Sequence, residues 1–186
     1  MRRGAPVLVS SFLALGAACG GGASTEVPSS TAAGQPRMAP TPFRAEQIRA
    51  ACPVGRSSVW ALTTPDGTAR QRVVFAAHTA DGAVIESVAL GPDGEPAGAA
   101  ERGTATWEEL RLHASYPAAH TTITDATVEV PAGTFATRLY TVVDPEAGTT
   151  TRAWFAPALP GPPVRHVVEQ GGQIVSSMVL ERIHLP

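Results

Sequence analysis

The sequence contains no lysine and no asparagine, and all 14 of its basic side chains are arginines. The 16 acidic residues outnumber them, which gives a formal net charge of −2 at pH 7. Nucleic-acid-binding domains carry a basic patch, and electrostatic binding to anionic lipid needs clustered cations, whereas these arginines are scattered. The composition therefore argues against nucleic acid as a partner and against a polybasic membrane contact.

Residue patterns that would indicate an enzyme or a metal site are also missing. The chain has five histidines: His78, His113, His120, His166 and His184. No pair of them has a metal-ligand spacing such as H-x-x-x-H, and no nucleophile elbow, phosphate-binding loop or dinucleotide-binding glycine pattern occurs. We therefore expect a protein without enzymatic activity, cofactor or metal.

The N-terminal segment has the pattern of a secretory signal peptide. Arg2 and Arg3 precede the uncharged, mostly apolar run Val7–Ala18, which ends in small residues before Cys19. A charged start, a short apolar run and a small-residue cleavage site are typical of such a signal. The run is too short to span a bilayer, which takes about 20 residues. We therefore predict a signal peptide over residues 1–18.

The last residues of this leader, Leu15-Gly16-Ala17-Ala18-Cys19, resemble the bacterial lipobox. The resemblance implies cleavage just before Cys19 and attachment of acyl chains such as palmitate to its sulfur. Two or three chains, at about 0.8 kcal/mol per buried CH₂, hold a protein durably at a membrane. The alternative is a secreted protein with a Cys19–Cys52 disulfide. The two alternatives exclude each other because the chain has no third cysteine.

Residues 19–41 are predicted to be the lipidated cysteine and a disordered tether. The segment is rich in Gly, Ala, Ser, Thr and Pro, and its few large apolar residues cannot offset the entropy cost of ordering it. Glycine rather than aspartate follows Cys19. In well-studied bacterial envelopes, aspartate there favours retention in the inner membrane. We therefore expect the outer membrane, with the protein facing the periplasm or the cell surface.

Residues 42–186 are predicted to form a single β-rich domain. Eight runs are expected to be strands: 57–63, 70–79, 83–90, 121–130, 135–143, 149–155, 164–169 and 174–183. Their connections are too short for parallel crossovers, so the sheet should be antiparallel and meander-like. Asp81-Gly82 between two apolar runs predicts a type I′ hairpin turn, which needs positive φ at both central residues.

Two short helices complete the predicted domain. The first begins at Thr41-Pro42, ends before Pro53, and places Cys52 on its apolar face as a small buried hydrophobe. The second begins with a capping box formed by Thr106 and Glu109. Residues 135–143 and 174–183 are substantially apolar on both faces. Either helices cover the second face of the sheet, or the sheet curls around an apolar groove.

The stretch Val130–Phe135, followed by Ala153–Pro157, resembles a phrase found in many uncharacterised bacterial secreted and lipid-anchored proteins. Proteins with this phrase often resemble the lipoprotein-carrier half-barrel, a strongly bent antiparallel sheet that cups one or more helices. The resemblance implies a mainly β (α+β) fold, a half-barrel-like curved antiparallel sheet of about eight strands with two short helices. It implies little about function, since one fold serves many functions.

The leading interpretation is a non-enzymatic lipoprotein of the bacterial envelope, and two functions remain open within it. One is binding of a lipophilic ligand in the concavity of the sheet. The other is protein–protein interaction or assembly in the cell envelope. The side chains that could line a ligand groove are Trp60, Trp107, Trp154 and Tyr140. Large aromatic residues of this kind more often belong to the hydrophobic core.

Overall fold

The computed structural model describes residues 37–186, so the predicted signal peptide, Cys19 and most of the predicted tether lie outside the described part of the chain. Nine strands form one open sheet in the order β4-β3-β2-β1-β9-β8-β7-β6-β5. The strands are β1 (Ser57–Thr64), β2 (Gly67–His78), β3 (Gly82–Leu90), β4 (Glu101–Thr106), β5 (Thr121–Val130), β6 (Gly133–Asp144), β7 (Thr149–Phe155), β8 (Arg165–Gln170) and β9 (Gln173–His184). Every neighbouring pair is antiparallel.

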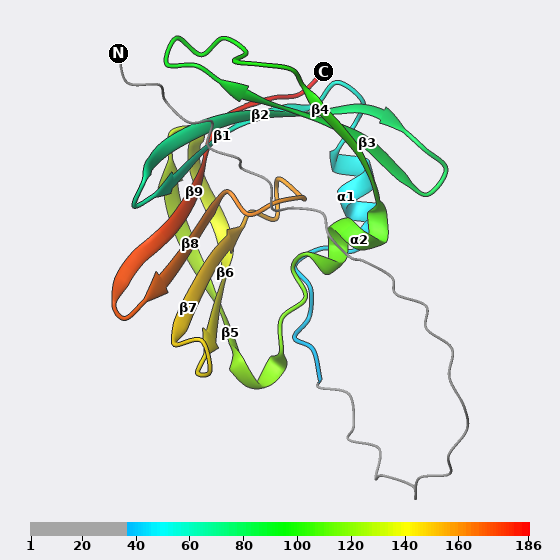
Figure 1. Ribbon diagram of the computed structural model, residues 1–186. Coiled ribbons are helices and arrows are strands. Elements are labelled where there is room, and N and C mark those ends of the chain that lie inside the picture. The colour runs from blue at the N-terminus through cyan, green and yellow to red at the C-terminus, as the bar shows by residue number, and fades with distance from the viewer. Residues whose placement is uncertain (1–36) are drawn as a thin grey trace, which may run out of the picture. The chain divides into compact units, whose positions relative to one another are not determined.

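The predicted fold class is confirmed, with one strand more than expected. Two short helices, α1 (Ala45–Ala51) and α2 (Trp107–Leu112), and a 3₁₀ turn, η1 (Ala118–His120), complete the domain. The curved sheet bends around the side on which the two helices lie (Figure 1). The strands follow one another as two meanders, β1–β4 and β5–β9, and the pairing of β1 with β9 joins them.

An unpredicted strand and the start of one helix are the main differences from the sequence prediction. The strand β4 was not predicted because its six residues are almost all exposed and show no apolar alternation, so its pairing with β3 defines it. The helix α1 begins at Ala45 rather than at Pro42. Arg44 is still in an extended conformation, and its N–H donates to the side-chain oxygen of Gln47 at 2.9 Å, which caps the first turn. The capping box of Thr106 and Glu109 is confirmed at the start of α2.

The predicted type I′ turn at Asp81-Gly82 is wrong, although the hairpin that it joins is present. The N–H of Thr79 donates to the carbonyl of Gly82 at 2.9 Å, and Gly82 is already the first residue of β3. Its φ is not in the left-handed region. Glycine is needed there for another reason: a Cβ atom would lie 2.1 Å from the carbonyl oxygen of Ala105 in β4.

Replacing Gly82 with alanine should therefore lower the free energy of unfolding by about 2 kcal/mol, because the β3–β4 backbones must separate to admit the methyl group. Urea denaturation of the full chain carrying Cys19→Ser measures this. Gly103→Ala in β4 is the matched control, since a Cβ there meets nothing within 4 Å. Equal effects of the two substitutions would contradict the close-approach explanation.

The buried apolar residues form two clusters. The helix-side cluster lies where α1 and α2 pack on the sheet, and its buried members are Phe43, Ile48, Cys52, Phe75, Ala83, Trp107, Ala114, Tyr140, Ala153 and Phe155. The hairpin-tip cluster contains Trp60, Val128, Val130, Ala156, Val164 and Leu180. The tip of the β5–β6 hairpin reaches back to β9, where the N–H of Ala132 donates to the carbonyl of Leu180 at 3.2 Å.

These two clusters explain why β6 is apolar on both faces. Along β6, Tyr140 enters the helix-side cluster while Phe135, on the opposite face, packs against the hairpin-tip cluster. Along β7, Phe155 enters the helix-side cluster, while its neighbour Trp154 packs against the hairpin-tip cluster. Helices therefore cover one face, and the hairpin tip covers part of the other.

The first described residues pack on the domain beside the segment that leads into β5. The N–H of Ala39 donates to the carbonyl of Tyr116 at 2.8 Å, and the N–H of Ala118 donates to that of Arg37 at 2.8 Å. Ala39 is buried. The packed domain thus includes residues 37–41, which the sequence analysis placed in the tether. No helix between residues 37 and 186 combines the length and the apolar character that crossing a membrane requires.

Candidate functional site

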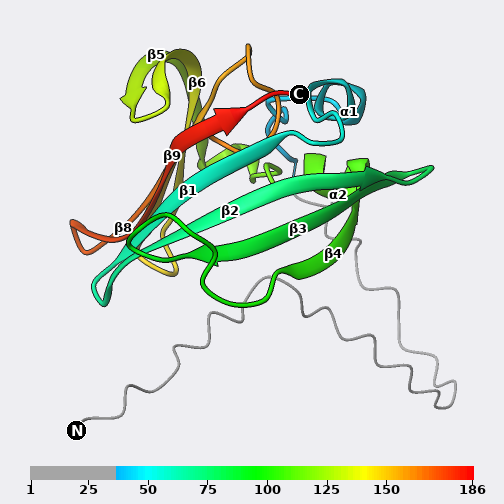
Figure 2. The ribbon, with the colours of Figure 1, turned by 90° about the horizontal axis from the view of Figure 1, so that it is seen from above.

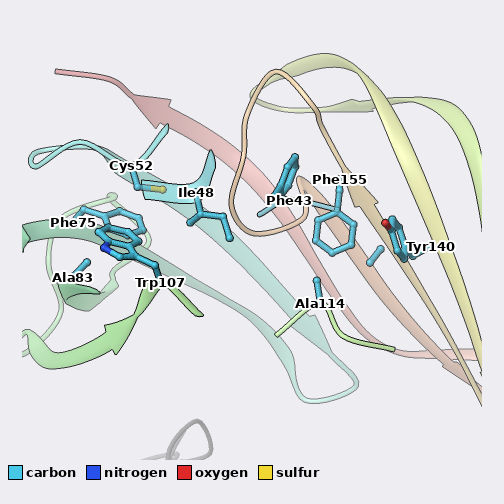
Figure 3. Packing of buried hydrophobic residues seen from close by; sticks show 10 residues of the cluster. Phe43, Ile48, Cys52, Phe75, Ala83, Trp107, Ala114, Tyr140 and Phe155 are labelled. Atoms are coloured by element: carbon cyan, nitrogen blue, oxygen red, sulfur yellow. The ribbon is translucent and has the colours of Figure 1, made fainter. Parts of the chain in front are cut away.

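The space between the sheet and the segment before α1 is filled by aromatic side chains (Figure 3). Tyr140 is 1 % exposed, and its ring meets Phe155 edge to face with the centroids 5.2 Å apart. Phe43 packs against Phe155 at 6.2 Å in a similar geometry. The Tyr140 hydroxyl donates to the carbonyl of Pro40 at 3.0 Å, and burial raises the pKa of this phenol. The rings of these three residues therefore fill this part of the helix-side cluster.

The structure does not bring the four predicted groove residues together. Tyr140 and Trp107 belong to the helix-side cluster, where Trp107 is buried at the start of α2 with its ring edge-on to His78 at 5.1 Å. Trp60 is buried in the hairpin-tip cluster. Trp154 is half-buried on that cluster, and the guanidinium of Arg165 lies 5.2 Å from its ring centroid, within cation–π range.

Two adjoining depressions lie instead between β5, β6 and the residues before α1. The first has a volume of about 580 Å³ and is lined by Asp125, Ala126, Thr127, Ala136, Thr137, Arg138 and Pro157. The second, of about 230 Å³, is lined by Pro42, Phe43, Gln47, Arg138, Phe155 and Pro157. Because they share Arg138 and Pro157, we treat them as one feature, the edge groove. It contains none of the four predicted aromatic residues.

The lining of the edge groove is mixed, with Phe43, Phe155 and alanine and proline side chains beside polar and charged groups. Asp125 supplies a carboxylate, Arg138 a guanidinium, Thr127 a hydroxyl and Gln47 an amide. Sequence reasoning missed the groove because its walls come from four separate segments of the chain. The one available signal was Arg138, a cation in the middle of an otherwise mostly apolar strand.

A buried arginine joins the end of α1 to the loop after β7. Arg56 is 2 % exposed, and its Nη1 donates to the carbonyls of Ala51 at 2.7 Å and Pro160 at 2.9 Å. The same nitrogen lies 3.0 Å from the sulfur of Cys52. Arg56 has no carboxylate partner among residues 37–186. We call this set of contacts the Arg56 bridge.

Cys52 is fully buried at this bridge, as predicted for a small core residue. Burial raises the pKa of its thiol, and the nearby Arg56 opposes this only in part. It forms no disulfide within the described chain. Since the thiolate is the reactive form of cysteine, both the burial and the pKa make this sulfur unreactive.

In the Cys19→Ser chain, Cys52 should therefore resist iodoacetamide at pH 8 in native buffer and react fully in guanidinium chloride. The mass of the intact protein measures this. A second chain that also carries Thr104→Cys on the exposed strand β4 is the control and should gain one adduct under native conditions. Rapid native alkylation of Cys52 itself would show that the sulfur is accessible.

The remaining titratable groups of residues 37–186 form no cluster suited to a metal ion. No three of the His, Cys, Asp and Glu side chains in this range are placed to hold one. Nε2 of His78 lies 2.9 Å from the carbonyl oxygen of Cys52. His166 is half-buried in β8, and burial lowers its pKa. His78 is exposed but lies against Trp107, and His166 is half-buried within the sheet.

Comparison with known proteins matches no protein family and no curated protein. Among solved structures, MucB in the MucA/MucB complex of Pseudomonas aeruginosa superposes with a TM-score of 0.51 and 8 % identity, over 75 % of this chain and 54 % of that chain. A structure of MucB alone gives a TM-score of 0.52 and 8 % identity, over 74 % and 55 %. A candidate lipoprotein from Parabacteroides distasonis gives a TM-score of 0.42 and 12 % identity, over 72 % and 96 %.

The likeness to MucB concerns the fold, because the identity is only 8 %. This chain also spans only about half the length of the MucB chains that it matches. The nine-stranded sheet with its two helices therefore has the same fold as part of MucB, and the comparisons assign the chain to no family.

Proposed function

We propose that this protein is a non-enzymatic lipoprotein of the bacterial envelope whose folded domain binds another protein. The observation that carries the proposal is the filled helix-side cluster, in which Phe43, Tyr140 and Phe155 occupy the space that a lipophilic ligand would need. The depressions that do occur combine charged and polar groups with apolar ones, among them Phe43 and Phe155. Surfaces of this kind suit recognition of polypeptides, whose backbone and side chains offer matching hydrogen bonds.

The comparison with solved structures supports the same proposal. MucB has been crystallised both alone and in a complex with MucA, so a longer protein that contains this fold is known in a protein complex. The present chain shares the fold and only half of MucB's length, so its own partner is a separate question. We take from MucB only that a domain of this kind is compatible with protein binding.

The envelope location belongs to the proposal as well, because Cys19 lies outside the described residues. Acylation of Cys19 would attach the chain to a membrane, which we expect to be the outer one, with the domain on its periplasmic side or at the cell surface. Replacing Cys19 with serine should move the protein from the membrane fraction to the soluble fraction. Membrane retention of the variant at the wild-type level would rule out this anchor.

Photo-crosslinking in intact cells tests protein binding directly. A benzoylphenylalanine placed at Gln47, which is exposed beside the edge groove, or at other exposed positions should give a protein adduct of defined mass from a limited set of sites. Exposed positions on the side of the domain that faces away from the bound protein serve as internal controls and should give no adduct. If no exposed position of residues 37–186 gives a protein adduct, protein binding is excluded as the function.

A further inference from the structure

The strand β5 ends the sheet and leaves one side of its backbone without a partner strand. It pairs only with β6, without any shift in register along its ten residues. Its stretch Thr122–Thr127 is exposed at every position except the half-buried Ala126. Outer N–H and C=O groups of such an edge are ready to bind another extended chain. Figure 2 shows β4 and β5 at the two ends of the sheet.

The edge of β5 has few of the features by which proteins usually protect a free edge. Short length, proline, bulges and lysine prevent unwanted pairing, and β5 has none of these four, although it carries the charges of Asp125 and Glu129. The opposite edge, β4, has only six residues, carries the exposed charges of Glu101 and Arg102, and runs directly into α2, which packs against it. Of the two edge strands of the sheet, β5 is therefore the less protected.

The side chains along β5 also indicate the charge of a partner. Asp125, Thr127 and Glu129 share one face of the strand, since successive side chains alternate. Both carboxylates are exposed, and neither forms an ion pair with a residue of the described chain. Arg138 lies opposite Asp125 in the β5–β6 register, so Glu129 is the carboxylate without a cation across from it on β6. Asp125 and Thr127 also line the edge groove, which adjoins the strand on this side.

Resting on the proposed function, we propose that β5 is where the partner protein binds, by adding an extended segment along Thr122–Glu129 as a further antiparallel or parallel strand. Backbone hydrogen bonds would supply the pairing, and side chains beside the edge groove would supply selectivity. Residues opposite Asp125 and Glu129 lie four apart on one face of the added strand. The segment is therefore expected to carry arginine or lysine at positions i and i+4.

Two other occupants of the edge fit less well. A second copy of this chain that paired through its own β5 would bring the carboxylates of the two strands together, and like charges on paired strands are destabilising. The chain's own residues 20–36 contain one charged residue, Glu26, and no basic residue. A separate protein with a basic extended segment matches the edge better than either.

Synthetic peptides test the proposal with the Cys19→Ser full chain. One ten-residue peptide of threonine and valine carries arginine at its fourth and eighth positions, and a second carries glutamate there. The arginine peptide should bind at least about tenfold more tightly at low salt, and this preference should weaken as salt screens the exposed charges. When it is bound, hydrogen exchange of the amides of residues 122–127 should slow, while that of β4 stays unchanged.

Charge reversal on β5 gives the matched comparison. The double variant Asp125→Arg/Glu129→Arg should prefer the glutamate peptide, whereas Asp66→Arg/Glu101→Arg, with the same change in net charge at exposed positions elsewhere, should keep the preference for arginine. Protection of β4 instead of β5, equal binding of both peptides, or no binding would overturn the inference. So would a dimer in sedimentation that Thr124→Lys abolishes, because a second copy would then occupy the edge.

Failure of this inference is distinguishable from failure of the proposed function. If photo-crosslinking yields a protein adduct from other surfaces while benzoylphenylalanine at Thr124 yields none, the protein binds a partner away from β5. Thr104, an exposed threonine on the opposite edge strand β4, is the matched control position for this experiment. An adduct from Thr124 and none from Thr104 is the expected result.

Discussion

Replacing Arg56 with alanine is expected to lower the free energy of unfolding by about 2 to 3 kcal/mol. The substitution removes the guanidinium that donates hydrogen bonds to the carbonyl oxygens of Ala51 and Pro160. Each buried acceptor that is left without a hydrogen bond costs about 1–3 kcal/mol. The wild-type protein spends free energy on burying the Arg56 guanidinium without a carboxylate partner among the described residues. The alanine variant avoids this cost, which offsets part of the loss. The end of α1 and the loop after β7 should therefore separate more readily, and urea denaturation measures the change.

Two further variants make the Arg56 prediction specific. Arg56→Lys should also destabilise, because a single ammonium on a flexible stem does not reproduce the planar guanidinium geometry of the bridge. Arg72→Ala, which removes an exposed arginine from β2, should change stability by less than about 0.5 kcal/mol. If Arg56→Ala behaves like Arg72→Ala, the Arg56 bridge does not stabilise the fold.

Replacing Phe155 with alanine should have the largest effect of any substitution considered, about 4 kcal/mol. Phe155 is 2 % exposed and stands between Phe43 and Tyr140, so its removal leaves a cavity at the centre of the helix-side cluster. For a chain of this length, such a loss corresponds to a melting temperature lower by roughly 8–16 °C. Thermal unfolding followed by circular dichroism measures it.

An exposed apolar residue supplies the control for Phe155. Ile174 is 58 % exposed at the start of β9, so Ile174→Ala should cost less than about 0.5 kcal/mol. A small effect of Phe155→Ala, below about 1 kcal/mol, would mean that the helix-side cluster is loosely packed. In that case the space around Phe155 could still admit a ligand, and the argument for a filled interior would fail.

The parts of the fold that the sequence predicted correctly depend on local chemistry. The capping box at Thr106 and Glu109 acts within one helical turn. The apolar runs of the longer strands depend only on neighbouring residues. The antiparallel sheet follows from them because the connections are short.

The parts that differed depend on contacts between distant segments. The strand β4 forms by pairing with β3, and Gly82 is required by the backbone of Ala105, neither of which a local pattern contains. The distribution of the aromatic residues between two clusters depends on how far the sheet bends. The edge groove, with walls from residues near 42, 125, 138 and 157, could not be predicted for the same reason.

Native mass spectrometry of the Cys19→Ser chain, isolated from the envelope of cells that produce it, tests most directly whether the interior of the domain is full. We predict the mass of the polypeptide alone, because Tyr140, Phe155 and Phe43 occupy the concave side of the sheet. A stoichiometric bound lipid, lost when the protein is denatured, would contradict this account.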